Sequence, residues 1–179
     1  MASTYSNDLR IELQTTGENA GTWGTKTNAA LTQIAEAFSY GTKDCFAADA
    51  NQTVTVPDGT ADASRGLYLK VTSSATLTAT RTLTLGPNTI SRLMFIENAT
   101  TGSQSIAISQ GSGANVTIAT AKTAVVYLDG AGSGAAVVDA MAKVDPGVTD
   151  TLAEVLGAGN TTGGTDLAVS TGDDITFAD

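Results

Sequence analysis

The sequence contains no histidine and only one cysteine, Cys45, in 179 residues. Histidine is the commonest catalytic base and metal ligand in proteins, and a single cysteine cannot form a zinc cluster or an intrachain disulfide. Ser–His and Cys–His nucleophilic sites and zinc sites are therefore excluded. Cys45 stands beside Phe46 in a mildly apolar stretch, which favours a small buried side chain over a reactive thiol.

Basic residues are also few: nine Lys and Arg stand against 18 Asp and Glu, which gives a net charge of −9. The nine are scattered singly between Arg10 and Lys143. Nucleic acids and anionic membrane surfaces bind clustered cations, so we expect neither as a partner. The sequence has no run of roughly 18 apolar residues that would span a membrane, and its start lacks the basic and apolar regions of a signal peptide.

Aromatic residues make up only 5% of the chain, whereas threonine, alanine and the 19 glycines are abundant. Small and β-branched residues suit short strands joined by tight turns. They do not build the usual aromatic-lined ligand pocket. The composition therefore favours a β-rich chain without a deep small-molecule site.

The acidic residues are numerous enough for a pair of catalytic carboxylates of the glycosidase type. Asp173 and Asp174 are adjacent, however, so on a strand they would point to opposite faces. Asp58 and Asp62 lie in a turn-rich stretch, where aspartate usually bonds to its own backbone. The glycine-rich segments have neither the lysine of a phosphate-binding loop nor the spacing of a calcium loop. We expect no catalytic site, no metal and no cofactor, and hence a protein that is not an enzyme.

The first predicted segment, residues 1–42, joins an N-terminal attachment segment to a helix. Apolar and polar residues alternate over residues 8–14 with the period of a half-buried strand, which places Leu9, Ile11 and Leu13 on one face. A glycine-punctuated loop follows and carries the only tryptophan, Trp23. This strand and loop can pack on their own domain or dock onto another subunit, and the pattern does not decide between the two.

A helix is predicted over residues 27–40, with Thr27 or Asn28 as its N-cap and Gly41 at its C-terminal end. Its apolar stripe has the spacing i, i+3 and i+7 and consists of Leu31, Ile34 and Phe38. An isolated helix of this length is not stable, so the stripe needs a partner surface. The β domain and the equivalent helices of an oligomer are the two candidates.

Residues 43–143 form the second predicted segment, a small β domain. Eight short β-prone runs are separated by turn residues and recur at intervals typical of an antiparallel β-sandwich or a jelly-roll-like domain. The runs are residues 51–57, 66–72, 76–85, 92–98, 104–109, 115–119, 123–129 and 135–140. The continuous apolar runs at 93–97 and 124–128 are expected to be central strands that are covered on both faces.

Residues 144–179 form the third predicted segment. A short helix is expected over residues 149–157, with capping-box spacing between Thr151 and Glu154. Two brief strands, at 166–170 and 174–178, follow between glycine turns and are too small to fold alone, which is typical of a repeating or intertwined stem. Because the pattern is interrupted at the last residue, we expect the natural chain to continue.

The order of these motifs resembles one known family. The opening STYSNDLRIELQTTGENAGTWGTKTNAALTQIAEAFSYG resembles the N-terminal module of tail-fibre proteins of marine and cyanobacterial phages, in which a strand, a TGE-x-x-GTWG loop and a helix precede a small β domain. The N-x-TTG turn at residues 98–102 and the K-T-A-x-x-Y-x-D-G strand at 122–130 resemble that β domain. The last residues, from 152, are similar to the repeat that begins the fibre shafts.

The resemblance implies a structural virion protein: a homotrimer, made in the cytoplasm of the host bacterium and located in the virion tail. Its N-terminal segment would attach the fibre to tail, adaptor or nozzle proteins, and a distal region outside this sequence would bind the host receptor. Carried onto this sequence, the attachment candidates are Leu9, Ile11, Leu13, Gly17, Glu18, Gly21, Thr22, Trp23 and Gly24. The helix residues Leu31, Ile34 and Phe38 are the candidates for a trimer contact.

Two alternatives remain at this point. The same modules could build a head-decorating fibre or a neck appendage. The chain could also be a host-surface carbohydrate-binding or depolymerising domain, which would need exposed aromatic rings that stack on sugars. The available rings are dispersed in the sequence: Tyr5, Trp23, Tyr40, Tyr68 and Tyr127. The sequence therefore favours the fibre over the carbohydrate-binding module.

Overall fold

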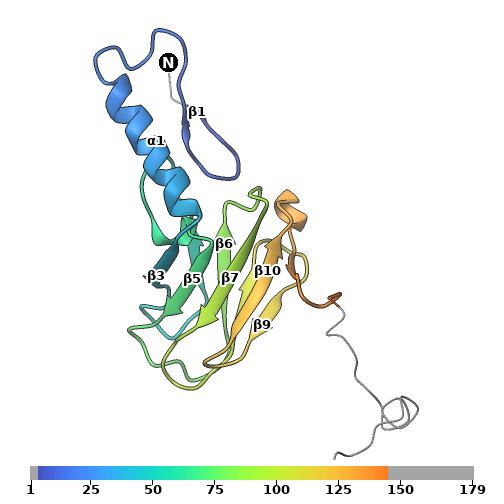
Figure 1. Ribbon diagram of the computed structural model, residues 1–179. Coiled ribbons are helices and arrows are strands. Elements are labelled where there is room, and N and C mark those ends of the chain that lie inside the picture. Colours follow the sequence, from blue (N-terminus) through green and yellow to red (C-terminus); the bar gives the residue numbers. More distant parts are fainter. Residues whose placement is uncertain (1–3, 145–179) are drawn as a thin grey trace, which may run out of the picture. The chain divides into compact units, whose positions relative to one another are not determined.

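The computed structural model describes residues 4–144 (Figure 1). The chain divides into two units, Met1–Lys143 and Val144–Asp179. The short helix and the two stem strands expected after residue 144 lie outside the described residues. None of the helices in residues 4–144 has the length and apolar character needed to cross a membrane.

The β domain contains all eight strands that the sequence predicts, and a ninth strand that it does not. The ninth, β3 (Tyr40–Asp44), directly follows the helix. The predicted ones are β4 (Gln52–Thr55), β5 (Tyr68–Thr72), β6 (Arg81–Gly86), β7 (Arg92–Asn98), β8 (Ile106–Ser109), β9 (Val116–Ile118), β10 (Thr123–Leu128) and β11 (Val137–Asp139). Two short 3-10 turns, η1 (Ala63–Arg65) and η2 (Gly132–Gly134), lie between them. The mainly β class is confirmed.

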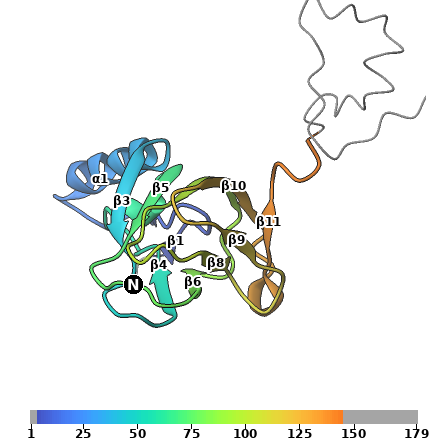
Figure 2. The same cartoon turned by 90° about the horizontal axis from the view of Figure 1, so that it is seen from below.

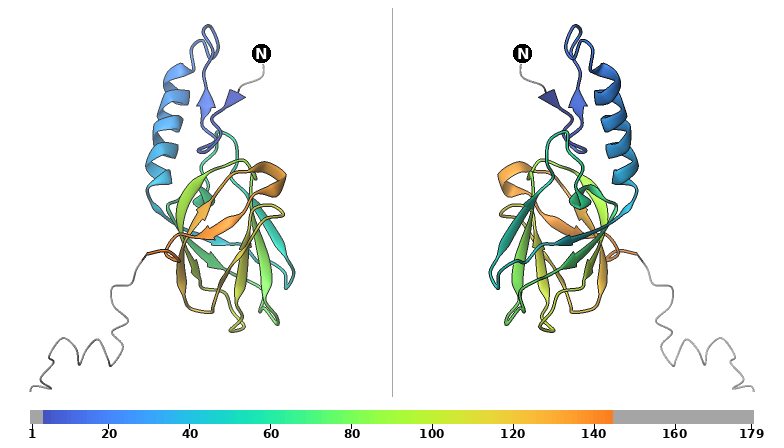
Figure 3. Two further views of the ribbon diagram at one scale, coloured as in Figure 1. Left: turned by 90° about the vertical axis from the view of Figure 1, so that its right-hand side faces the viewer. Right: turned by 90° about the vertical axis from the view of Figure 1, so that its left-hand side faces the viewer.

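The strands form a five-stranded sheet in the order β11-β10-β7-β5-β3 and a four-stranded sheet in the order β4-β6-β8-β9, which face each other in Figures 2 and 3. The expected antiparallel pairing holds for three of the seven pairs in these sheets, and the other four are parallel. From β3 to β8 the chain alternates between the sheets, and each strand reverses direction. Successive strands of one sheet therefore run the same way, because a strand of the other sheet makes the crossover.

A single hydrophobic core of buried side chains lies between the two sheets. The longer strands contribute alternate residues, as a strand's period of two requires, whereas the edge strand β3 has no residue in the core. The five-stranded sheet supplies Leu69, Val71, Met94, Ile96, Val126 and Leu128, and the four-stranded sheet supplies Val54, Leu83, Leu85, Ile106, Ile108 and Ile118. Cys45 belongs to the same core, which confirms its interpretation as a small buried side chain.

The thiol of Cys45 is expected to be inert in the native protein. Burial raises the pKa of this thiol to about 12, so the reactive thiolate is scarce at neutral pH. At pH 8 we expect labelling by a thiol reagent to be slower than for a free cysteine by a factor on the order of 1,000. One thiol per chain should react promptly once denaturant is added. Fast labelling without denaturant would contradict the buried position.

The prediction that 93–97 and 124–128 are covered on both faces is wrong for the described residues. In β7 the side chains of Met94 and Ile96 are buried, whereas Leu93 and Phe95 between them are exposed. In β10 Tyr127 is exposed in the same way. These strands are central in their sheet, but only one of its faces meets the core.

The N-terminal segment contains a hairpin of β1 (Thr4–Tyr5) and β2 (Glu12–Leu13), followed by the helix α1 (Trp23–Ala37). The strand expected over residues 8–14 is wrong, because a turn occupies its first half and Arg10 has a left-handed φ of 54°. The helix starts four residues before the predicted 27 and ends at Ala37. Gly41, expected as the C-cap, lies in β3.

Candidate functional site

The hairpin and α1 lie side by side beyond one end of the sheets (Figures 1 and 3). Polar side chains join them. Glu12 of β2 forms a 2.8 Å ion pair with Lys26 in the second turn of α1, and this hydrogen-bonded carboxylate raises the pKa of Lys26. Asn19 also donates to Glu12, over 3.2 Å. We refer to residues 4–38, the hairpin, its following loop and the helix, as the arm.

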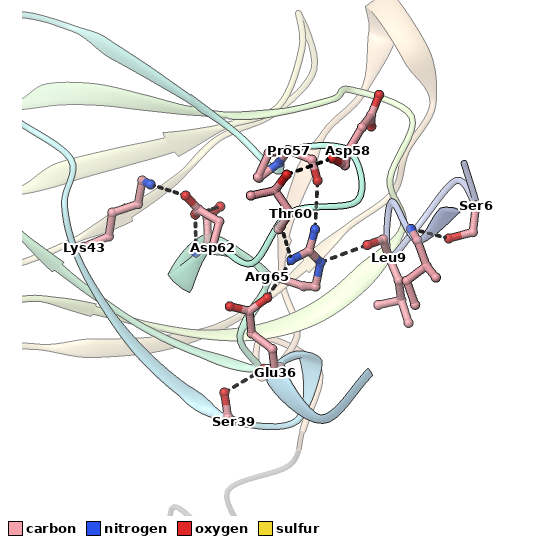
Figure 4. Close-up of polar contacts among 12 residues, drawn as sticks. Ser6, Leu9, Glu36, Ser39, Lys43, Pro57, Asp58, Thr60, Asp62 and Arg65 are labelled. Carbon is pink, nitrogen blue, oxygen red and sulfur yellow. Dashed lines mark hydrogen bonds and ion pairs between the residues drawn. The ribbon is translucent and has the colours of Figure 1, made fainter. Parts of the chain in front are cut away.

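A fully buried arginine, Arg65, fixes the base of the arm (Figure 4). Its Nε donates to the carbonyl oxygen of Leu9 in the β1–β2 turn over 2.9 Å, and its Nη1 to Oε2 of Glu36 on α1 over 2.5 Å. Two more bonds, both of 2.8 Å, reach the carbonyl oxygens of Pro57 and Thr60 in the loop between β4 and η1. One guanidinium therefore ties the hairpin and the helix to the β domain.

The β1–β2 turn has further contacts with the β domain. Arg10 Nε lies 2.7 Å from Oδ1 of Asp58. Three more bonds join the same turn to the loops: Asn7 Nδ2 to the Thr89 carbonyl oxygen (2.6 Å), the Ser91 amide to Asp8 Oδ1 (2.9 Å) and the Gly59 amide to the Arg10 carbonyl oxygen (2.8 Å). The turn thus packs on its own domain. The sequence allowed either this packing or docking onto another subunit, and the structure shows the packing for these residues.

A second arginine, Arg92, stabilises the same region from β7. Its Nη1 donates to the carbonyl oxygen of Arg65 over 2.8 Å, and its Nη2 donates to that of Ser64. Burial, followed by the neighbouring Arg65 cation, lowers the pKa of Arg92 to about 10, so it is still charged at neutral pH. Both arginines also line a largely apolar cavity of about 270 Å³, together with Leu9 and Phe38.

The attachment candidates divide into residues with local roles and residues with free apolar surface. Glu18 accepts a bond from the Thr15 amide, and the Thr22 hydroxyl donates to the Asn19 carbonyl oxygen, so both stabilise the loop itself. Gly17 and Gly21 both have φ of +83° with open space where a side chain would begin, and Gly24 is equally open. Leu9 and Ile11 are half-buried at the hairpin. Leu13 and Trp23 are exposed, and Trp23 retains 65% of its accessible surface.

The predicted apolar stripe of α1 does not pack on its own β domain. Leu31, Ile34 and Phe38 are exposed, with 76% of Phe38 accessible, and Phe38 lies just after the helix. The buried residue of α1 is instead the polar Gln33, at 3% exposure. The stripe is therefore available for contact with another chain.

The outer side of the five-stranded sheet carries several large apolar side chains, and we call it the aromatic face. Its apolar residues are Tyr40, Tyr68, Leu93, Phe95, Val125, Tyr127 and Val138, and polar side chains, among them Lys70 and Glu97, lie on the same side. Strand register aligns Tyr40 with Tyr68 and Tyr68 with Phe95, and the ring centroids lie 5.2 Å and 6.3 Å apart. These rings are dispersed in the sequence. The parallel strand register that brings them together leaves no local pattern from which their proximity could be predicted.

No family model matches this chain, and neither a curated protein nor a solved structure is similar to it. Within residues 4–144, no group of three or more Cys, Asp or Glu side chains is placed to hold a metal ion. The features that distinguish the molecule are thus the arm, its exposed apolar side chains and the aromatic face.

Proposed function

We propose that this chain is the anchor region of a trimeric phage tail fibre and that its arm attaches the fibre to the tail. The order of sequence motifs supports this identity. The β domain, in this proposal a two-sheet sandwich, is a spacer and a scaffold for the trimer, with no catalytic activity. The protein would then reside in the virion tail.

The observation that carries the proposal is an arm with a fixed base and with Leu13 and Trp23 exposed on either side of its tip loop. Buried hydrogen bonds from Arg65 hold the base, so the arm does not lose much conformational freedom when it binds. Figure 3 shows the loop between β2 and α1 at the end farthest from the sheets. Trp23 begins the helix there, and tryptophan is among the residues most enriched in the energetic centres of protein interfaces.

Replacing Trp23 by alanine should weaken attachment without unfolding the protein. A buried interface tryptophan contributes about 2 kcal/mol or more, so affinity for isolated tails should fall roughly 30-fold. Binding to tails that lack the fibre, together with fibre content of assembled virions, measures the effect. Thr25→Ala, also at an exposed position of α1, is the matched control and should bind normally.

The outcome also tests the assignment of the tip. Unchanged incorporation of Trp23→Ala would move the attachment site elsewhere. Loss of folding would make Trp23 a residue of the protein's own core. A head-decorating fibre or neck appendage would use the same arm on a different virion protein, so cross-linking from the tip to head or neck proteins would favour that alternative.

A further inference from the structure

The two outer faces of the β domain differ in kind. The four-stranded sheet points five threonines and an alanine outward: Thr53, Thr55, Thr82, Thr84, Ala107 and Thr117. This is the composition expected of a sheet face in contact with water. The five-stranded sheet of the same domain instead presents the aromatic face. Both sheets bury their inner faces in the same core, so packing of that core does not require the outer face of one sheet to carry large apolar side chains.

The aromatic face adjoins Phe38, the last residue of the apolar stripe. Phe38, Tyr40, Tyr68 and Phe95 line one shallow depression of about 440 Å³, together with Ser39 and Leu67. Five strands about 4.8 Å apart and about five residues long give the sheet face alone only about 400 Å², whereas a stable interface buries about 800 Å² on each partner. A stable interface would therefore have to include surface beyond the sheet face, and the exposed stripe of α1 is the apolar surface that adjoins it at Phe38.

One acid–base pair lies within the aromatic face. Lys70 and Glu97, aligned by register, form a 3.1 Å ion pair, and the Tyr68 hydroxyl also donates to Glu97 over 2.9 Å. The pair lowers the pKa of Glu97 and raises that of Lys70, so both stay charged. At the margins, the carboxylates of Asp44 and Asp139 accept backbone amide bonds.

This charge distribution favours a second copy of the chain as the occupant. A chain of net charge −9 repels its own copies, and they can approach only where the surface is neutral. An unlike, basic partner would instead be guided by unpaired acidic side chains at the centre of the contact, where Glu97 is paired with Lys70. A sugar would need free polar groups beside the rings, whereas the Tyr68 hydroxyl, Glu97 and Lys70 bond to one another.

We propose that copies of this chain associate through the aromatic face and the adjoining stripe of α1. The inference deepens the proposed function, in which the fibre is an oligomer, by assigning the surface that holds the copies together. Phe95 lies at the centre of the face, between Tyr68 and Val125 in the strand register.

The test is the mass of the full chain in solution, by analytical ultracentrifugation over a range of concentrations. The wild type should have a multiple of the 18.0 kDa of one chain, and three times that value for the trimer. Phe95→Lys should raise the dissociation constant about 100-fold and shift the mass toward a single chain. Leu93→Lys, in the neighbouring row with Tyr127 and Val138, should act in the same direction.

Thr117→Lys is the matched control, because it places the same charge on the outer face of the other sheet. It should leave the mass unchanged. Each lysine reduces the net negative charge, so a loss of assembly in the Phe95 and Leu93 variants cannot result from stronger repulsion between copies. Circular dichroism and thermal unfolding of all three variants show whether the fold is retained.

Two results would overturn the inference. The first is a wild type with the mass of one chain; if that single chain binds a glycan array and loses this binding with Phe95→Lys, the face is a carbohydrate site. The second is assembly that survives in both lysine variants. An oligomer that depends on Phe95 but never joins a tail would instead refute the proposed function and leave this inference intact.

Discussion

Replacing Arg65 by methionine is expected to lower the free energy of unfolding by about 3 to 5 kcal/mol. The guanidinium is fully buried and donates four hydrogen bonds, one of them to the carboxylate of Glu36. Methionine keeps much of the apolar stem but leaves three carbonyl oxygens and a largely buried carboxylate without their donor. An uncompensated buried charge is among the most costly defects in a folded protein.

Denaturant unfolding measures this loss, and limited proteolysis locates it. Because Arg65 joins the arm to the β domain, cleavage within residues 4–38 should become faster in Arg65→Met. Arg81→Gln is the control: Arg81 pairs with Asp49 over 2.7 Å, but both side chains are more than a quarter exposed. Such pairs contribute about 0 to 1 kcal/mol. Equal losses in the two variants would show that burial of Arg65 has no special role.

The second large effect is expected for Gly102→Ala, at the end of the N-x-TTG turn. Gly102 has a φ of +101°, and a Cβ there would lie 2.0 Å from the carbonyl oxygen of Leu77. The left-handed backbone alone costs about 1 to 2 kcal/mol for alanine, and forcing atoms into a packed region costs about 1 to 3 kcal/mol more. Their sum gives an expected loss of stability of about 4 kcal/mol.

Gly132→Ala separates the two contributions. Gly132 also has a left-handed φ, +72°, but no atom lies within 4 Å of its Cβ position. Its replacement should cost only the backbone term of about 1 to 2 kcal/mol. Thermal unfolding of both variants gives the difference. Similar midpoints in the two would mean that the contact with Leu77 relaxes without cost.

The asparagine and the first threonine of the N-x-TTG turn also have structural roles. Asn98 is buried, and its side-chain amide donates to the carbonyl oxygens of Gln104 and Ile118. Its Oδ1 accepts from both the amide and the hydroxyl of Thr100. The asparagine of the N-x-TTG segment thus ties the turn to the backbone at Gln104 and Ile118, and the threonine stabilises the turn by bonding to that asparagine.

Local pattern predicted the strands well and their arrangement poorly. Alternation such as that of Leu83 and Leu85, or of Ile106 and Ile108, marks a strand with one buried face, and these side chains are indeed in the core. Which strand lies beside which depends on contacts between distant segments. The alternation of the chain between sheets, and hence the parallel pairs, could not be derived from turn spacing.

The arm shows where a short pattern misleads. Leu9, Ile11 and Leu13 alternate as in a strand, but a left-handed residue between the first two changes the direction of the chain. Trp23, Gly24 and Thr25 are weak helix formers, so the sequence predicts a helix that starts after them. In the structure these three residues are helical, because tertiary context overrides local propensity. For the candidate site, the sequence left open what covers Trp23 and the α1 stripe, and in the structure their side chains are exposed. Arg65, a lone arginine in a turn-rich stretch, gave no signal.

The strand order also has a mechanical consequence. The arm enters the five-stranded sheet at β3, on one edge, and the chain leaves the β domain after β11, on the other edge. In a fibre pulled from its distal end, tension would pass from β11 through β10, β7 and β5 to β3 before it reached the arm. Every hydrogen-bonded ladder of that sheet would share the load, and forced unfolding would require several of them to shear together.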